Sequence, residues 1–95
     1  MNKDFMTYVM EIMNESMIIN SMIKDRTVDP VVFVEYSGHV SVLQVELFAL
    51  GWNNDEKGAT RRWYLYLDND FYIDMLQECV KVLQAIRQNL VKKSA

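Results

Sequence analysis

Few side chains in this 95-residue sequence have the types and spacing that catalysis or metal binding requires. His39 is the only histidine and Cys79 the only cysteine, which is too few for a zinc site built from such ligands. Nucleophilic catalysis needs a nucleophile beside a base, and no such set is present. Asp68, Asp70 and Asp74 could hold a cation, but they equally suit the capped start of a helix. We therefore expect a protein that is not an enzyme and that has no metal and no cofactor.

Charge is distributed unevenly along the chain. The formal net charge is −3, with four lysines and arginines against nine acids in residues 1–60, and six against four in residues 61–95. Nucleic-acid backbones are bound mainly by clustered basic side chains. The basic clusters here are Arg61-Arg62 and Lys92-Lys93. This distribution disfavours general nucleic-acid binding.

Several features of the sequence favour a cytoplasmic location. The lone cysteine allows no disulfide within the chain and fits a reducing compartment. The first sixteen residues have a charge or an amide every few positions, unlike a signal peptide. Apolar runs such as VVFV and LFAL are far shorter than the ~20 residues of a membrane-spanning helix. We expect one cytoplasmic domain over residues 1–95, outside the membrane.

Hydrophobic periodicity predicts five elements. Apolar residues spaced three and four apart predict helices over residues 3–24 and about 70–92. Alternating β-branched and aromatic residues predict strands over residues 31–37, 40–50 and 61–68. The result is a single α+β domain in the order helix, three-stranded antiparallel meander, helix. Both helices are expected on one face of the sheet; the alternative is that one helix crosses to the other face.

The first hairpin has a register that side-chain parity predicts. We expect a two-residue turn, Ser37-Gly38 or Gly38-His39, with glycine supplying a positive φ angle. This turn pairs even residues of the first strand with odd residues of the second, which joins their apolar rows into one face. The rows are Val32, Val34, Leu43, Val45, Leu47 and Ala49. His39 is thus expected to be a structural residue of the turn.

The predicted first helix has a second apolar stripe made of methionines, at Met6, Met10, Met13 and Met17. A surface helix normally buries one apolar stripe, so this helix is expected to contact two things. Methionine suits both core filling and adaptable binding surfaces. Core filling is the favoured interpretation, and a partner-binding face is the alternative. In the last helix, Cys79 falls in the apolar stripe and is expected to be an inert core thiol.

The second face of the predicted sheet is aromatic, and we expect a partner to cover part of it. Contiguous exposed apolar surface marks interfaces, and tyrosine and phenylalanine are enriched there. The expected partner-binding residues, with acids that would steer a basic partner, are Phe33, Glu46, Phe48, Trp52, Asp55, Glu56, Tyr64 and Tyr66. One alternative is a specialised nucleic-acid binder that uses Arg61, Arg62 and base stacking on the same face. Another is a purely structural subunit whose methionines and open sheet both serve homo-oligomerisation. The favoured binding module is itself expected to self-associate, as a homodimer.

The order of elements resembles that of the double-stranded-RNA-binding domain, but the residues differ. That family begins its last helix with a basic Lys-Lys-x-Ala-Lys-like segment that grips phosphates. The corresponding segment here reads DNDFYIDM, which would repel them. The loop SGHV lacks the proline of the family's Gly-Pro-x-His loop. The resemblance therefore covers the succession of elements and does not extend to function.

Three short strings between the predicted helices, HV at 39–40, GW at 51–52 and YLD at 66–68, resemble small accessory proteins of Gram-positive phages and prophages. The likeness extends over nearly the whole chain and brings no catalytic residues. It implies a protein that acts in the host cytoplasm. Some proteins of this class, anti-CRISPR inhibitors among them, bind and block host machinery such as a defence nuclease.

Overall fold

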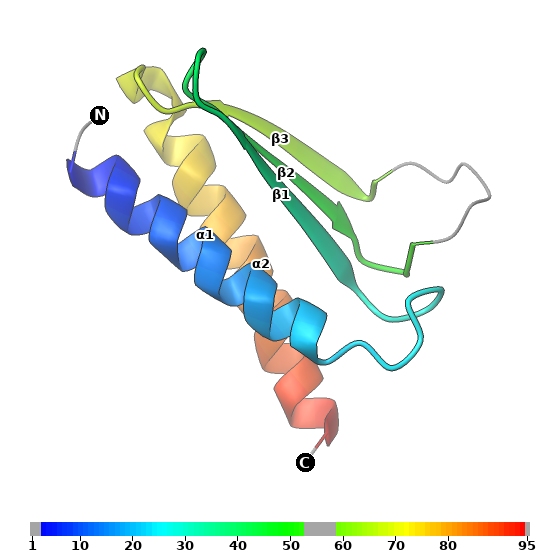
Figure 1. The fold of residues 1–95 in the computed structure, drawn as a ribbon. Helices are drawn as coiled ribbons and strands as arrows, with labels where there is room; N and C mark the ends of the chain where they lie inside the picture. Colours follow the sequence, from blue (N-terminus) through cyan, green and yellow to red (C-terminus); the bar gives the residue numbers. More distant parts are fainter. Residues whose placement is uncertain (1–2, 53–58, 95) are drawn as a thin grey trace.

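The computed structural model describes residues 3–52 and 59–94 and confirms the predicted α+β class and order of elements (Figure 1). A short 3₁₀ helix, η1, precedes the last helix, and the side chain of Asn69 caps it by accepting a hydrogen bond from the N–H of Phe71. Most boundaries lie within a few residues of the prediction. The elements are α1 (Lys3–Ser21), β1 (Val31–Ser37), β2 (Val42–Phe48), β3 (Arg61–Tyr66), η1 (Asp70–Tyr72) and α2 (Ile73–Ser94).

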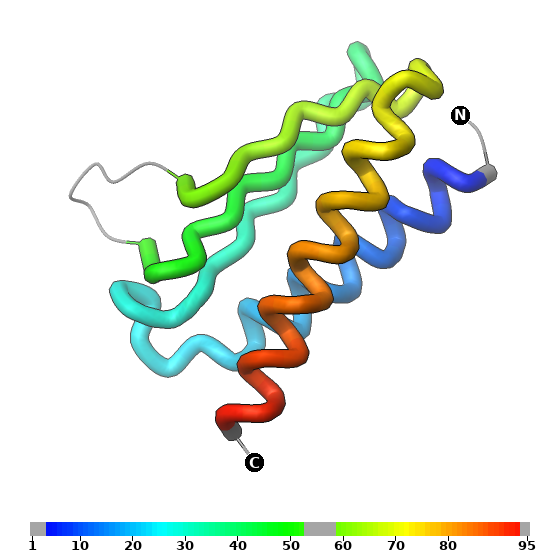
Figure 2. Tube along the Cα trace, turned by 180° about the vertical axis from the view of Figure 1, so that it is seen from behind, coloured from blue at the N-terminus to red at the C-terminus, as the bar shows by residue number. Residues whose placement is uncertain are grey.

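Two layers make up the domain. The antiparallel sheet has the order β1-β2-β3, and α1 and α2 lie side by side against one of its faces (Figures 1 and 2). Helix α1 contacts β1, α2 contacts β3, and the two helices pack along each other. The expectation that both helices cover one face is therefore confirmed. Within residues 3–52 and 59–94, no helix is apolar over a length that would cross a membrane.

The core lies between the layers and consists of the side chains that the two periodicities predict. The side chains of Trp63 and Leu65 in β3, and of Leu67 just after it, point into the core, whereas Arg62, Tyr64 and Tyr66 face outward. Cys79 is buried in the core stripe of α2, as predicted. The largest fully buried side chains are Phe5, Ile12, Ile19, Leu43, Val45, Leu47, Leu65, Leu67, Leu76 and Leu83.

The hairpin between β1 and β2 has the predicted parity but a longer loop. Val32 pairs with Leu47 and Val34 with Val45, which confirms the joined apolar rows. The last pair is Ser37 with Val42, so the connection has four residues, 38–41, and the predicted two-residue turn is wrong. The positive φ angle, 52°, belongs to Ser41 and not to Gly38. Its carbonyl accepts a hydrogen bond from the N–H of Leu67 at 2.8 Å, which ties the loop to the end of β3.

The methionine stripe of α1 faces away from the core. Met10 and Met17 are 64% and 67% exposed, and Met6 and Met13 are 51% and 43% exposed. The favoured interpretation of these residues as core filling is therefore wrong for the single chain. The reason is geometric. The stripe of α1 that holds Phe5, Ile12 and Ile19 faces both β1 and α2, so the methionine stripe beside it faces away from both.

Polar side chains join α1 to its neighbours. Glu15, which is buried, forms an ion pair with Arg87 of α2. At the other end of α1, Asn20 both donates to the carbonyl of Val32, at 2.8 Å, and accepts from its N–H, at 2.9 Å. Because Val32 lies on the outer edge of the sheet, this contact covers part of an exposed strand edge. It also anchors the end of α1 at Ser21, earlier than predicted.

Candidate functional site

The face of the sheet opposite the helices is uncovered over the described residues, and it carries the side chains that the sequence assigns to a partner. Phe33, Tyr64 and Tyr66 are each between 44% and 50% exposed on this outer face. The pairing places three rows of side chains across the strands. These rows are Phe33–Glu46–Arg62, Glu35–Gln44–Tyr64 and Ser37–Val42–Tyr66.

An aromatic cluster forms at the β2–β3 loop end of this face. The ring of Phe33 lies edge-on to Phe48, with centroids 5.5 Å apart, and edge-on to Trp52 at 6.1 Å. Edge-to-face contacts at these separations are the preferred geometry of aromatic pairs. The guanidinium carbon of Arg26 lies 5.1 Å from the centre of the Trp52 ring, a cation–π distance. Three predicted contact residues are thus brought together, and Arg26, which the sequence analysis missed, borders them.

The connection from α1 to β1 holds Arg26 in place. Asp29 accepts hydrogen bonds from the N–H groups of Asp25 and Lys24, and these bonds lower the pKa of its carboxyl group. Asp25 in turn accepts from the hydroxyl and the N–H of Thr27, which lowers its pKa. The carbonyl of Arg26 accepts a 2.6 Å hydrogen bond from the N–H of Trp52. The connection is therefore fixed both internally and against the aromatic cluster.

Gly51 allows the chain to pass beneath this connection just before Trp52. Its φ angle is +97°, a conformation that glycine adopts far more readily than other residues. A Cβ atom at Gly51 would lie 2.3 Å from the backbone of Thr27. The string GW at 51–52 therefore has a structural basis: the glycine permits the close approach that positions the tryptophan.

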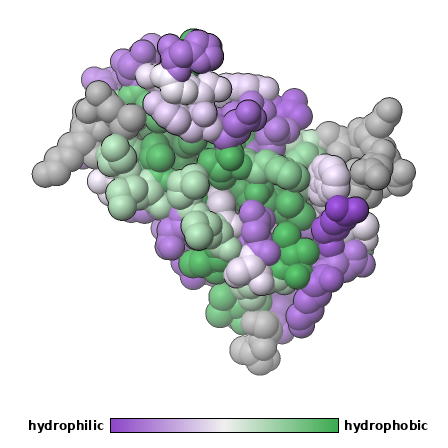
Figure 3. Space-filling view, in the orientation of Figure 1, coloured by the Kyte–Doolittle hydropathy of each residue, from purple (hydrophilic) through white to green (hydrophobic). Residues whose placement is uncertain are grey.

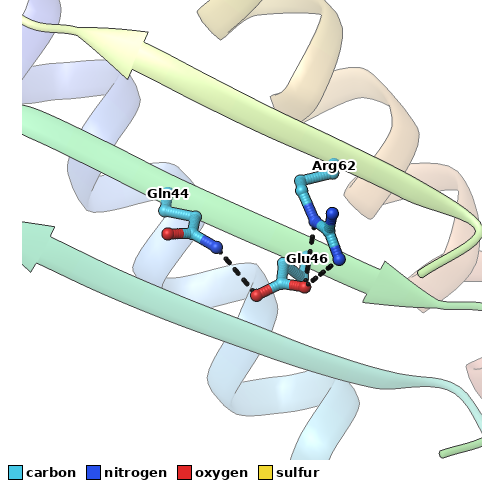
Figure 4. A network of polar contacts seen from close by, with 3 residues as sticks. All are labelled: Gln44, Glu46 and Arg62. Atoms are coloured by element: carbon cyan, nitrogen blue, oxygen red, sulfur yellow. Dashed lines mark hydrogen bonds and ion pairs between the residues drawn. The ribbon is translucent and has the colours of Figure 1, made fainter. Parts of the chain in front are cut away.

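The centre of the outer face is a polar network on β2 and β3 (Figure 4). One carboxylate oxygen of Glu46 accepts from Arg62 Nε and Nη2, at 3.1 and 2.9 Å, and the other accepts from Gln44 Nε2 at 2.8 Å. Arg62 neutralises the carboxylate that the sequence analysis expects to steer a basic partner. This network separates Phe33 from the tyrosines of β3.

The tyrosines extend the aromatic surface toward the other end of the sheet. Tyr64 stands beside Gln44, and Tyr66 beside Val42. The ring of Tyr66 also lies 5.2 Å from that of Tyr72 in η1. Tyr64 and Tyr66 therefore share the outer face with the aromatic cluster but do not join it.

Arg61 and Arg62, the residues of the nucleic-acid alternative, are directed to opposite faces. Arg62 pairs with Glu46 on the outer face, whereas Arg61 pairs with Glu78 of α2 on the helix side. The Arg61 guanidinium also lies 5.0 Å from the centre of the Trp63 ring. The two residues do not form one basic patch. Two expected steering residues, Asp55 and Glu56, lie outside the described residues.

The groups with possible covalent or metal chemistry are not assembled into a site. Burial, followed by the nearby Glu78 carboxylate, raises the pKa of the Cys79 thiol to about 12, so the thiol is protonated at neutral pH. His39 lies exposed in the β1–β2 loop. Among the side chains that the structure describes, no three of His, Cys, Asp or Glu are grouped where they could hold a metal ion.

The described residues thus form an open sheet face that has aromatic groups at both ends and a Glu46–Arg62 ion pair at its centre. Comparison of the chain with protein-family models, with curated protein sequences and with solved structures finds no match.

Proposed function

We propose that this chain is a non-catalytic protein-binding module and that the outer face of the sheet is its contact surface. The observation that carries the proposal is the aromatic surface that exposed Phe33 forms with half-buried Phe48 and Trp52, and that exposed Tyr64 and Tyr66 extend. An antiparallel sheet face that meets only water is usually polar. A partner that covered these rings would remove their apolar area from water, which stabilises the complex.

The arrangement of the face supports a protein as the partner. A few residues carry most of the binding energy of a protein–protein interface, and tryptophan, tyrosine and arginine are enriched among them. Here Phe33, Phe48, Tyr64 and Tyr66 stand on strands, and Gly51 and the Arg26 contact fix Trp52, which follows β2, before any partner arrives. Pre-positioned rings lose little conformational entropy on binding. The Glu46–Arg62 pair lets the centre of the face be buried as a neutral unit.

The partner that we propose is a host protein with a basic surface, such as a defence nuclease, which the module would block by occupying it. The net charge of −3 would draw the chain toward a basic surface. The resemblance to phage and prophage accessory proteins supports a host target and action in the host cytoplasm. No bond of the target would be made or broken.

A nucleic-acid partner is the second candidate, and it is the less supported of the two. It would need cations beside the stacking rings, as in single-strand binding surfaces. Two arginines lie at the described part of this surface. The guanidinium of Arg62 is already held by Glu46, and that of Arg26 already lies over the Trp52 ring.

Affinity capture from a bacterial lysate, with and without nuclease treatment, separates the two candidates. The proposal predicts a bound protein that remains after nuclease treatment. The nucleic-acid alternative predicts capture that disappears with nuclease and that weakens steeply with salt. Recovery of the bait alone under both conditions would contradict the proposed function.

A further inference from the structure

The seam between α1 and β1 is closed at one end and open at the other. The Asn20–Val32 hydrogen bonds close it near the end of α1. Toward the start of α1 it widens into a groove of about 360 Å³. Figure 3 views the molecule from this side and shows apolar residues gathered over α1 and the neighbouring edge of the sheet. The groove's walls include Met6, Met13, Val34 and Tyr36, and its lining reaches the core residues Leu43 and Leu67.

The four methionines differ in their relation to this groove. Met6 and Met13 line it. Met10 and Met17 are not part of the lining and are the more exposed pair. The stripe therefore alternates between residues that border a hollow and residues that project beside it. A projecting side chain of one helix could therefore enter a hollow beside the same stripe of another helix, as a knob enters a hole in coiled-coil packing.

The intervals between the four methionines are the same in either direction along the helix. The intervals from Met6 to Met10, Met13 and Met17 are four, three and four residues, the a/d spacing of a coiled-coil seam. If a second α1 lay antiparallel across a two-fold axis, Met6 would face Met17 of the other copy, and Met10 would face Met13. Each projecting methionine would then meet one that lines a groove. A parallel arrangement would instead place projecting residues against each other.

Charge also favours a second copy over a different protein. The stripe is uncharged, and so are Thr7, Asn14 and Ser21 on its solvent side; Lys3, in the first turn of α1, is the one charged residue in that row. At about 100° per residue, Asp4 and Glu11 lie more than a third of a turn from the centre of the stripe. Two chains of net charge −3 repel each other, and a contact surface without acids adds nothing to that repulsion. A basic partner would gain nothing from this surface.

The area of the methionine stripe and groove indicates how tightly two copies of the chain should bind each other. The stripe spans twelve residues, about 17 Å along a helix that is about 10 Å across. This footprint is smaller than the ~800 Å² per partner of a standard stable interface. The contact should therefore be reversible and depend on concentration.

We infer that the methionine stripe and the α1–β1 groove form a two-fold interface between two copies of this chain, with the α1 helices antiparallel. This interface lies on a different side from the proposed partner surface and does not depend on it.

Sedimentation equilibrium over about 1 μM to 1 mM tests the inference, a range in which contacts of this size dissociate. The full chain should change from its 11.2 kDa mass to twice that value as concentration rises.

Variants of the stripe test which residues make the contact. Met10→Glu should raise the dissociation constant roughly 100-fold or more, because each copy would bury an unpaired charge. The double variant Met10→Lys with Met13→Glu should recover most of the affinity, since each lysine would face a glutamate of the other copy. Leu50→Glu, which adds the same charge at an exposed apolar position outside α1, is the matched control.

Cross-linking tests the direction of the helices. Mixed Met10→Cys and Met13→Cys chains should form a disulfide across the axis more readily than either variant alone, and buried Cys79 should not compete. A mass of one chain at every concentration would overturn the inference. So would a dimer unaffected by Met10→Glu, and so would preferred cross-linking of Met10→Cys chains to each other.

Discussion

Replacing Gly51 by alanine should destabilise the protein far more than the same change at Gly38. At Gly51 an alanine would adopt φ +97°, which costs about 1–2 kcal/mol for an L-residue. Its Cβ would also lie 2.3 Å from the Thr27 backbone, so the connection that carries Arg26 would have to move, at a further cost of about 1–3 kcal/mol. We expect the free energy of unfolding to fall by about 2–5 kcal/mol, the sum of the two costs, and the melting temperature by at least about 8 °C.

Gly38 provides the matched control. A Cβ atom there would meet only the Tyr36 ring at 3.5 Å, which is ordinary contact, and its φ angle is not in the left-handed region. Gly38→Ala should therefore change stability by less than about 1 kcal/mol, and in the stabilising direction if the unfolded chain loses entropy. Urea unfolding, followed by circular dichroism and tryptophan fluorescence, measures both variants. Equal stability of the two variants, or a larger loss at Gly38, would refute the assignment of the strained position to Gly51.

Three further predictions concern contacts elsewhere in the fold. Asn20→Ala removes both hydrogen bonds to buried Val32, and urea unfolding should show a loss of about 1–3 kcal/mol; a loss below about 0.5 kcal/mol would contradict the contact. Tyr64→Ser should cost less than about 1 kcal/mol, whereas Leu65→Ser, one residue along β3, should cost more than about 3 kcal/mol; the reverse order would mean that the two sheet faces are exchanged. Because burial raises the pKa of Cys79 from its ordinary 9.0 to about 12, the folded chain holds its proton where the unfolded chain loses it. The free energy of unfolding should thus fall as pH rises from about 9 to 12, and a thiol reagent at pH 8 should label the folded protein far more slowly than the unfolded chain; equal labelling rates would contradict burial of the thiol.

The sequence could predict the faces of the sheet because only one parity joins Val32 and Val34 to the apolar row of β2. It could not predict the loop length, because loops of two and four residues have the same parity. Ser41 takes the positive φ angle, although glycine is the residue that turn preferences select. Local preference was overridden there by the hydrogen bond from Leu67 to the Ser41 carbonyl.

The alternation of side chains along each strand predicted which residues of the site face outward. It could not predict the parts of the site that depend on contacts between residues far apart in the sequence. Phe33 and Tyr64 follow from alternation along their strands. The Arg26–Trp52 contact joins residues that are 26 positions apart through irregular connections, which no periodicity indicates. Periodicity revealed the two apolar stripes of α1, but the packing of α2 decided which stripe was buried. The same tertiary contacts separate Arg61 from Arg62, which are adjacent in the sequence.

The central claim is that the outer face of the sheet binds a protein, and one comparison tests it most directly. The affinity of the captured partner is measured for the unchanged chain, for Tyr64→Ser with Tyr66→Ser, and for Tyr36→Ser. Tyr36 is the control because it is a similarly exposed strand tyrosine that faces the α1–β1 groove. We predict that the double variant binds at least ~30-fold more weakly while its fold is retained, and that Tyr36→Ser binds as the unchanged chain does. Equal affinities for all three chains, or a loss confined to Tyr36→Ser, would contradict the assignment of the outer face as the binding surface.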